Sequence, residues 1–314
     1  MKQNKFYLLA AATALLLSAC NNEEVPGTQE SDLARFTGSI EGVKTRAYDT
    51  TWENGDQIGI TGTSGWETYT NMAYNWNASG YFTADQKDIY YNTPEDVAFS
   101  AYYPWKTELS SSTSYDFNTD AQSQQKTFDF LYATGTGSKY EPEVDFNFTH
   151  CMSKLSFIVK AGADVTLDEV KAAKYSLRSF LNNGTFDRVT GKVNAAGSVL
   201  TAPWAFANSS IEADNAPSNV STERNSVTYN LILVPQTFES YLFFTASVLL
   251  DGINLQEFYA NIDFSEIEGN GNVNEMKPGY QYNVTVNVNK TGLSVGKCEI
   301  TPWTELSGSI EATM

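Results

Sequence analysis

The sequence is poor in the residues on which most catalytic and metal sites depend. Its 314 residues include only three cysteines, Cys20, Cys151 and Cys298, and a single histidine, His150. A structural zinc site needs four such ligands at characteristic spacings, which this chain does not offer. A triad built on His150 would need a nucleophile and an acid that the sequence does not identify. We therefore expect no catalytic residues, no metal and no cofactor.

The one adjacent pair with catalytic residue types, His150 and Cys151, is better explained as part of a strand. Neighbouring residues in a strand point to opposite faces, so adjacency works against a Cys/His dyad. Cys151 and Cys298 could form one disulfide, which exported proteins permit. Two separate buried thiols are at least as compatible with the sequence, because spacing alone does not show proximity.

Charged residues are also scarce, at 18% against an ordinary ~25%, and the balance is strongly acidic. The formal net charge is −17, and removing residues 1–19, which hold two lysines and no acids, gives −17 − 2 = −19. Phosphate would repel such a chain, so nucleic acid is excluded as a partner. The glycine stretches lack the Gly-Lys-Ser/Thr ending of a phosphate-binding loop and read as turns.

A long hydrophobic run occurs only near the N-terminus. Residues 6–17 are largely apolar and follow Lys2 and Lys5, which is typical of a secretory signal. This run is too short for a membrane-spanning helix, which needs about 20 residues. Later in the chain, the longest apolar run, residues 241–250, is interrupted by Thr245 and Ser247.

The four residues that end the signal, Leu17-Ser18-Ala19-Cys20, resemble a bacterial lipobox. That resemblance implies cleavage before Cys20 and attachment of a lipid to its thiol. We therefore expect residues 1–19 to be a lipoprotein signal peptide. The polar and acidic residues 21–33 would follow as a flexible tether.

What the sequence has in abundance is strand and turn signals. "YQYNVTVNVN", residues 280–289, alternates apolar and polar side chains over ten positions, and "KLSFIVKA", residues 154–161, does so over a shorter stretch. "SVTYNLILVP" and "YLFFTASVLL" are apolar on both faces and predict interior strands. Only residues 168–174, "DEVKAAK", favour a helix, and they could equally be a strand edge. The sequence predicts an all-β protein.

The length allows two domains, with a boundary expected near Gly162 in "KAGADV". The prediction is an N-terminal β-sandwich over residues 47–162 and a C-terminal β-sandwich over residues 163–291. Residues 20–46 would be a tether with a removable first strand, and residues 292–314 a C-terminal strand region.

The two ends of the chain carry nearly the same seven-residue sequence. "FTGSIEG" begins at Phe36 and "LSGSIEA" begins at Leu306, and each places large apolar residues two positions before and after a glycine. The inward sets are Phe36, Gly38 and Ile40 near the start, and Leu306, Gly308, Ile310 and Ala312 near the end. Alternation continues to Met314, although termini usually fray. The two segments are predicted to compete for one place in a β-sheet; two ordinary strands with different neighbours remain the alternative.

Arg46 favours the competing-strand interpretation. Arginine is rare, with five in the chain, and "KTRAYD" lies between the first predicted strand and the next one. Cleavage between Arg46 and Ala47 would release the first strand and expose an apolar slot, which is an aggregation hazard unless filled. The tail of a second copy could fill it by strand addition. Head-to-tail contacts of this kind do not close, so they build a fibre.

Several blocks together resemble the fimbrillin family of pilus subunits. They include the lipobox, "VAFSAYYPW", "FDFLYATG", "VDFNFTHCMSKLSFIVKAG" and "MKPGYQYNVTVNVNKTGLSVGKCEITPW". The resemblance implies two transthyretin-like Greek-key β-sandwich domains in tandem and export as a lipoprotein to the outer membrane. It also implies lipid on Cys20, cleavage at Arg46-Ala47 by an Arg-specific protease, and donor-strand exchange. The segment from about Gly292 to Met314 matches the donor region.

The tail favours a stalk subunit that polymerises with copies of itself or with related pilus subunits and supports adhesion and colonisation. The alternative is a monomeric, lipid-anchored surface protein that binds glycans, which the Trp and Tyr content permits. Such a protein would gain nothing from a tail that alternates to its last residue. An exported hydrolase is disfavoured, because no nucleophile–base pair is present.

Overall fold

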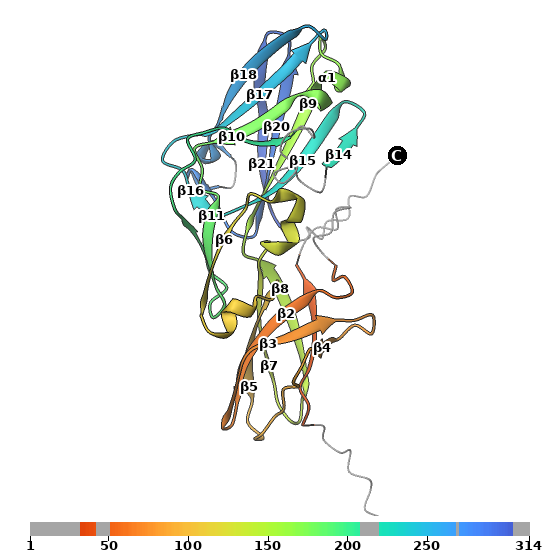
Figure 1. The fold of residues 1–314 in the computed structure, drawn as a ribbon, viewed down its shortest axis with the longest axis vertical. Coiled ribbons are helices and arrows are strands. Elements are labelled where there is room, and N and C mark those ends of the chain that lie inside the picture. Colours follow the sequence, from red (N-terminus) through yellow and green to blue (C-terminus); the bar gives the residue numbers. More distant parts are fainter. Residues whose placement is uncertain (1–31, 42–50, 208–219, 268–269, 304–314) are drawn as a thin grey trace, which may run out of the picture. The chain divides into compact units, whose positions relative to one another are not determined.

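The computed structural model describes residues 32–41, 51–207, 220–267 and 270–303, and strands dominate these residues (Figure 1). This confirms the all-β prediction. The only α-helix among them is α1 (Leu167–Ala172). Its N-cap, Thr166, accepts a hydrogen bond from the backbone N–H of Glu169, whose side chain binds back to the Thr166 N–H. This capping box explains why a helix forms at "TLDEVKA" despite its short length.

The N-terminal strands close into a seven-stranded barrel in the order β1-β4-β3-β2-β5-β7-β8. Side chains alternate between buried and exposed along β8, so one face of that strand lines the barrel core. A β-sandwich was predicted for this part, and β1 closes its strands into a ring because it lies between β8 and β4. The strands are β1 (Arg35–Ile40), β2 (Gln57–Ser64), β3 (Glu67–Trp76), β4 (Phe82–Ala84), β5 (Val97–Tyr103), β7 (Leu131–Gly137) and β8 (Glu143–His150).

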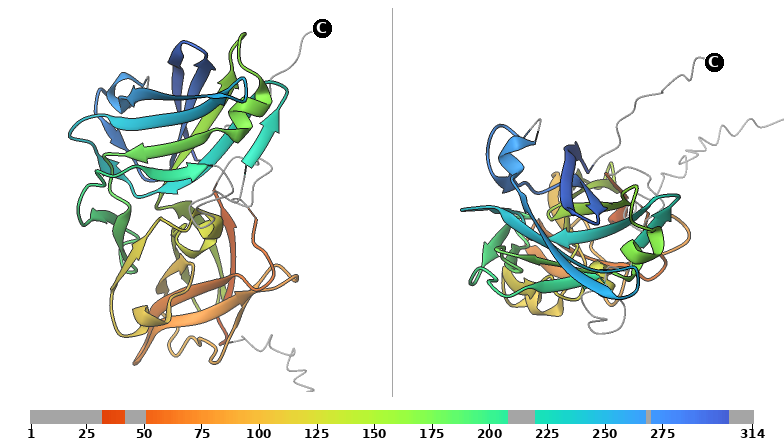
Figure 2. Two further views of the ribbon diagram at one scale, coloured as in Figure 1. Left: turned by 45° about the horizontal axis from the view of Figure 1, so that its top comes forward. Right: turned by 90° about the horizontal axis from the view of Figure 1, so that it is seen from above.

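The C-terminal strands form two facing sheets around a second core (Figure 2). One sheet has the order β14-β15-β9-β20-β21 and the other the order β13-β10-β17-β18. As predicted, "SVTYNLILVP" and "YLFFTASVLL" give interior strands, β15 and β17. The strands are β9 (Ser153–Ala161), β10 (Lys174–Arg178), β13 (Trp204–Ala207), β14 (Val220–Glu223), β15 (Ser226–Leu233), β17 (Leu242–Leu250), β18 (Asn254–Ile262), β20 (Tyr280–Asn289) and β21 (Gly292–Pro302).

The predicted boundary near Gly162 does not match the division of the cores. Strand β9 was assigned to the N-terminal part, but it pairs with β15 on one side and β20 on the other. Its apolar residues Leu155, Phe157 and Val159 are fully buried in the C-terminal core. The change of core therefore falls between β8 and β9, at residues 151–152. The apolar sequence of a long strand indicates that the strand is buried, but it does not indicate which core buries it.

A smaller sheet and a third apolar cluster join these two parts. Strand β6 precedes β7 in the chain, and it pairs with β11, which follows β10. Beside this pair, Phe130 stacks on Phe186 with ring centroids 4.3 Å apart. Trp303, directly after β21, is buried in the same cluster. The remaining elements are β6 (Ser114–Asn118), β11 (Asn183–Asp187), β12 (Val193–Ala196), β16 (Gln236–Thr237), β19 (Glu275–Met276), and the 3-10 turns η2 (Thr107–Ser110), η3 (Gln122–Thr127) and η4 (Phe264–Glu266).

Candidate functional site

The candidate site is the place in the barrel that residues 32–41 occupy, called here the β1 slot. Strand β1 runs parallel to β8 through six residue pairs, from Arg35–Glu143 to Ile40–Phe148. On its other edge it pairs with β4 only at Phe36–Phe82. The backbone N–H of Ala34 donates to the Ile89 carbonyl at 2.9 Å, and that of Tyr91 donates to the Asp32 carbonyl at 2.7 Å. The slot thus has one long edge and one short, irregular edge.

Phe36 fills the centre of the slot. Its side chain is fully buried, and its ring lies 5.1 Å from Tyr74, 5.2 Å from Phe99 and 5.7 Å from Phe146, measured between centroids. Edge-to-face and offset stacked aromatic pairs add about 0.5–1.5 kcal/mol each beyond the burial of apolar area. Removing β1 would therefore expose the inner faces of three other barrel strands.

Gly38 allows the strand to approach β8 closely. A Cβ atom at this position would lie 2.9 Å from the Phe146 carbonyl oxygen and 3.0 Å from the Phe148 ring, so a larger residue would push the strands apart. The Gly38 carbonyl accepts a hydrogen bond from the indole N–H of Trp52 at 2.8 Å. Any strand that takes this place needs a glycine at its centre.

The end of the slot near Ile40 opens on a hollow of about 390 Å³. Trp52 lines it and packs edge-to-face against Phe82 and Phe148, with ring centroids 5.1 Å away in both cases. Lys126 and Asp56 supply charged groups to the same hollow. This end of the slot therefore borders a partly apolar space that is also lined by charged groups.

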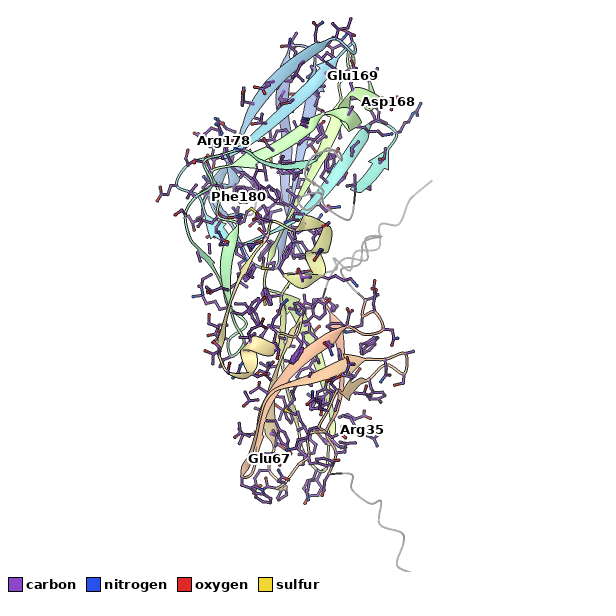
Figure 3. All side chains as sticks on the ribbon, in the orientation of Figure 1. Arg35, Glu67, Asp168, Glu169, Arg178 and Phe180 are labelled. Carbon is purple, nitrogen blue, oxygen red and sulfur yellow. The ribbon has the colours of Figure 1, made fainter. Side chains whose placement is uncertain are left out.

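Polar groups frame the slot on its outer face. Arg35, which Figure 3 labels, is the first residue of β1. Its Nη1 atom lies 3.9 Å from Glu143 Oε1. Both side chains are more than half exposed, so this pair adds little stability. The Asn147 amide donates to the Glu41 carboxylate at 2.6 Å, and Lys139 Nζ lies 2.9 Å from Asp32 Oδ1. These contacts hold the two ends of the segment against the β7–β8 hairpin.

The His150–Cys151 region is built for packing. The His150 ring is stacked on Trp303 with centroids 3.6 Å apart, and its Nδ1 lies 3.1 Å from Asp129 Oδ1. Burial raises the pKa of the Cys151 thiol far above its usual range, and the nearby Asp129 carboxylate adds to this, so the thiol stays protonated. Cys151 and Cys298 are separate free thiols. The described residues hold no group of three or more potential metal ligands.

Of the predicted site residues, the structure brings together Phe36, Gly38 and Ile40, all on the inner side of the β1 slot. The lipidation position Cys20, the cleavage position Arg46-Ala47 and the tail residues Leu306, Gly308, Ile310 and Ala312 lie outside the described residues. Residues 292–302, assigned by the sequence to the donor region, form β21 within the chain's own sheet.

The sequence did not indicate which residues lie opposite β1 in the barrel. Val144, Phe146 and Phe148 form the long inner wall of the slot, and all three are buried. The alternation in "EVDFNFTH" marks them as inward-facing, but nothing in that pattern identifies β1 as the neighbour. Lys139 was missed because its partner, Asp32, lies 107 residues away in the sequence.

The sequence of this chain matches a known family model over most of its length. The model is described as fimbrillin-like, and it matches residues 45–303. The chain belongs to the fimbrillin-like family. It is therefore related to fimbrial structural subunits, which form cell-surface appendages, and not to a family of enzymes.

A curated relative agrees with this assignment. The fimbrillin-like chain is 31% identical over 199 residues to a Bacteroides uniformis protein named "Putative fimbrium subunit Fim1C". The match covers 59% of this chain and 65% of that relative, so it spans slightly less than two thirds of the relative's length.

Solved structures share the fold over nearly the whole chain. Two crystal structures, each described as a "putative cell adhesion protein", come from Bacteroides ovatus and Bacteroides uniformis. Their TM-scores are 0.68 and 0.66, their identities 20% and 26%, and they cover 88% and 86% of this chain. In both cases 99% of the solved chain is covered.

Among the described residues, no helix is long and apolar enough to cross a membrane.

The burial of Phe36 leads to a prediction for the full fimbrillin-like chain. Phe36→Ala should lower the free energy of unfolding by about 3–5 kcal/mol, because it removes a fully buried ring and leaves a cavity among three aromatic neighbours. Ser39→Ala, on the exposed side of the same strand, should change it by less than about 0.5 kcal/mol. Urea unfolding followed by tryptophan fluorescence measures both. Equal effects of the two substitutions would show that β1 does not contribute to the barrel core.

The two described cysteines should be poorly reactive in the native protein. Burial raises the pKa of Cys298 to about 11 and that of Cys151 further, and only a thiolate attacks a disulfide reagent. In a chain with Cys20→Ser, a disulfide reagent at pH 8 should label both thiols at least tenfold more slowly than in urea, with labelling of Cys298 rising toward pH 11. Fast labelling at pH 8, or no free thiol in urea, would contradict this.

Proposed function

We propose that this fimbrillin-like chain is a stalk subunit of a pilus that is exported as a lipoprotein and polymerises by donor-strand exchange. In this proposal, Cys20 carries the lipid and holds the precursor at the outer membrane. An Arg-specific protease cuts between Arg46 and Ala47, and β1 then leaves the barrel. The tail of a second copy, including Leu306 to Ala312, takes its place. The resulting filament supports adhesion and colonisation.

The observation that carries the proposal is the position of β1. This strand contributes a fully buried phenylalanine to the barrel core, yet the cut at Arg46 would sever it from all the strands that surround it. Before cleavage, the covalent link gives β1 a high effective concentration at its own slot, so a tail from another molecule does not compete. After cleavage that advantage is lost.

The tail has the composition that the slot requires. It offers a glycine flanked at two residues on either side by Leu306 and Ile310, which matches the spacing of Phe36, Gly38 and Ile40. The described fold ends at Trp303, so residues 304–314 follow the last strand of the chain's own sheet. An empty slot would expose aromatic side chains and unpaired backbone groups of β8, which favours capture of another strand.

Cleavage after Arg46 is the first test. Treatment of the exported protein with an Arg-specific protease should give a chain that begins at Ala47 and forms ladders on a semi-denaturing gel. Arg46→Gln should abolish both the new N-terminus and the ladder. The matched control is Arg224→Gln, which removes an exposed arginine from the turn after β14 and should leave both unchanged. A cleaved product that remains monomeric would count against polymerisation.

The apolar anchor of the tail is the second test. Ile310→Asp should reduce the yield of polymer from the cleaved chain about tenfold or more, because a carboxylate would be buried in the slot without a partner. Ser309→Asp adds the same charge on the opposite side of the strand and should have a much smaller effect. Circular dichroism of the monomers shows that both variants fold. Polymerisation of Ile310→Asp at the wild-type level would place the donor strand elsewhere.

A further inference from the structure

The tail can fit the β1 slot in either of two directions. Residues 305–311 read Glu-Leu-Ser-Gly-Ser-Ile-Glu, which is symmetric about Gly308 apart from the exchange of Leu306 and Ile310. Leucine and isoleucine have equal numbers of carbon atoms, so neither large position distinguishes the directions. The alternation that suits the slot therefore leaves the direction of the strand open.

Gly38 fixes the register in both cases. Because a Cβ atom on the β1 backbone at this place would lie 2.9 Å from the Phe146 carbonyl oxygen, we place Gly308 at the position of Gly38 in both directions. A strand that runs in the direction of β1 then places Leu306 at Phe36 and Ile310 at Ile40. A strand that runs in the opposite direction places Ile310 at Phe36 and Leu306 at Ile40.

The beginning of the slot separates the two directions. In the direction of β1, the places of Asp32 and Leu33 would have to be filled by Pro302 and Trp303 of the donor. Both residues belong to the donor's own fold. Pro302 pairs with Tyr280 at the end of β21, and the N–H of Trp303 donates to the Gly279 carbonyl at 2.7 Å. Insertion in this direction would leave that part of the slot empty.

The opposite direction fills the slot to its end. Ala312 then takes the place of Ala34, which is only 4% exposed, and Met314 takes the place of Asp32. In the direction of β1, Thr304 would bury its hydroxyl at the Ala34 position, which is unfavourable unless the hydroxyl finds a partner.

We propose that the tail of a second copy enters the β1 slot antiparallel to the direction of β1. This rests on the proposed function, in which that tail replaces β1. Leu306, Gly308, Ile310 and Ala312 take the places of Ile40, Gly38, Phe36 and Ala34. The donor strand enters at the Glu41 end, beside the hollow lined by Trp52, and finishes beside Tyr91 and Lys139.

The hydrogen-bonding edge of β8 suits this arrangement. In the precursor, the N–H of Arg35 donates to the Pro142 carbonyl at 2.9 Å, and that of Glu41 donates to the Phe148 carbonyl at 2.8 Å. The even-numbered residues of β8 therefore direct their backbone groups toward the slot. A reversed strand meets them with its inward residues and forms the pairs Ile310–Val144, Gly308–Phe146 and Leu306–Phe148.

The exchange then replaces a parallel ladder with an antiparallel one, which is slightly more stable per residue. This gives the incoming strand an advantage over β1 on the long edge of the slot. On the short edge, the reversal turns the carbonyl groups of Ser307 and Ser309, instead of that of Gly308, toward the indole N–H of Trp52.

Cross-linking between neighbouring subunits tests the direction. Two double variants are compared, Glu311→Cys with Glu143→Cys, and Glu311→Cys with Thr149→Cys, both in a chain with Cys151→Ser and Cys298→Ser. Glu143 and Thr149 are exposed on the same side of β8, beside the places of Arg35 and Glu41. The cleaved variants are polymerised, treated with a short bis-maleimide, boiled in detergent and separated on a gel.

We expect covalent ladders from the variant with Glu143→Cys, with at least tenfold more cross-linked product than from the variant with Thr149→Cys. Moving the tail cysteine to Glu305→Cys should reverse this preference, and each single-cysteine variant should give none. A ladder from Glu311→Cys with Thr149→Cys alone would overturn the reversed direction while leaving donor-strand exchange intact. Polymers that cross-link in neither variant would overturn both, because the tail would then lie outside the slot.

Discussion

Closure of the N-terminal barrel depends on one strand that meets β8 along its whole length and β4 at a single residue pair. The barrel core is aromatic at this seam, since Phe36 packs between Tyr74, Phe99 and Phe146. No other described strand lies between β8 and β4, so the ring closes only while something fills that place. Under the function that we propose, the uncleaved chain can therefore be stable by itself and still hold a site for a second chain.

The segment that we propose as the counterpart of that site follows the last described strand, β21. Strand β21 is paired with β20 up to Pro302, and Trp303 is buried against His150 directly afterwards. The described residues therefore end at a firmly packed position, three residues before Leu306. The single histidine and Cys151 contribute to this packing, which accounts for their presence without any chemistry.

Much of the fold follows from local patterns in the sequence. Strand β20 alternates as "YQYNVTVNVN" predicts, and β15 and β17 lie inside their sheets, as their apolar sequences predict. The partner of a strand does not follow from such patterns, because pairing depends on residues far away: β6 joins β11 and β9 joins β20. For the same reason the sequence indicates that Phe36 faces a core, but the wall formed by Val144, Phe146 and Phe148 emerges only from the folded chain.

The position of β21 has a mechanical consequence for the filament that we propose. A pull on residue 304 in the direction of β21 would act on a strand that is held to β20 through nine residue pairs. Such a force loads the ladder in shear, so many hydrogen bonds share it before any of them breaks. Trp303, which directly follows β21, is buried in an aromatic cluster. In the proposed filament this burial would oppose the separation of β21 from β20 at its C-terminal end.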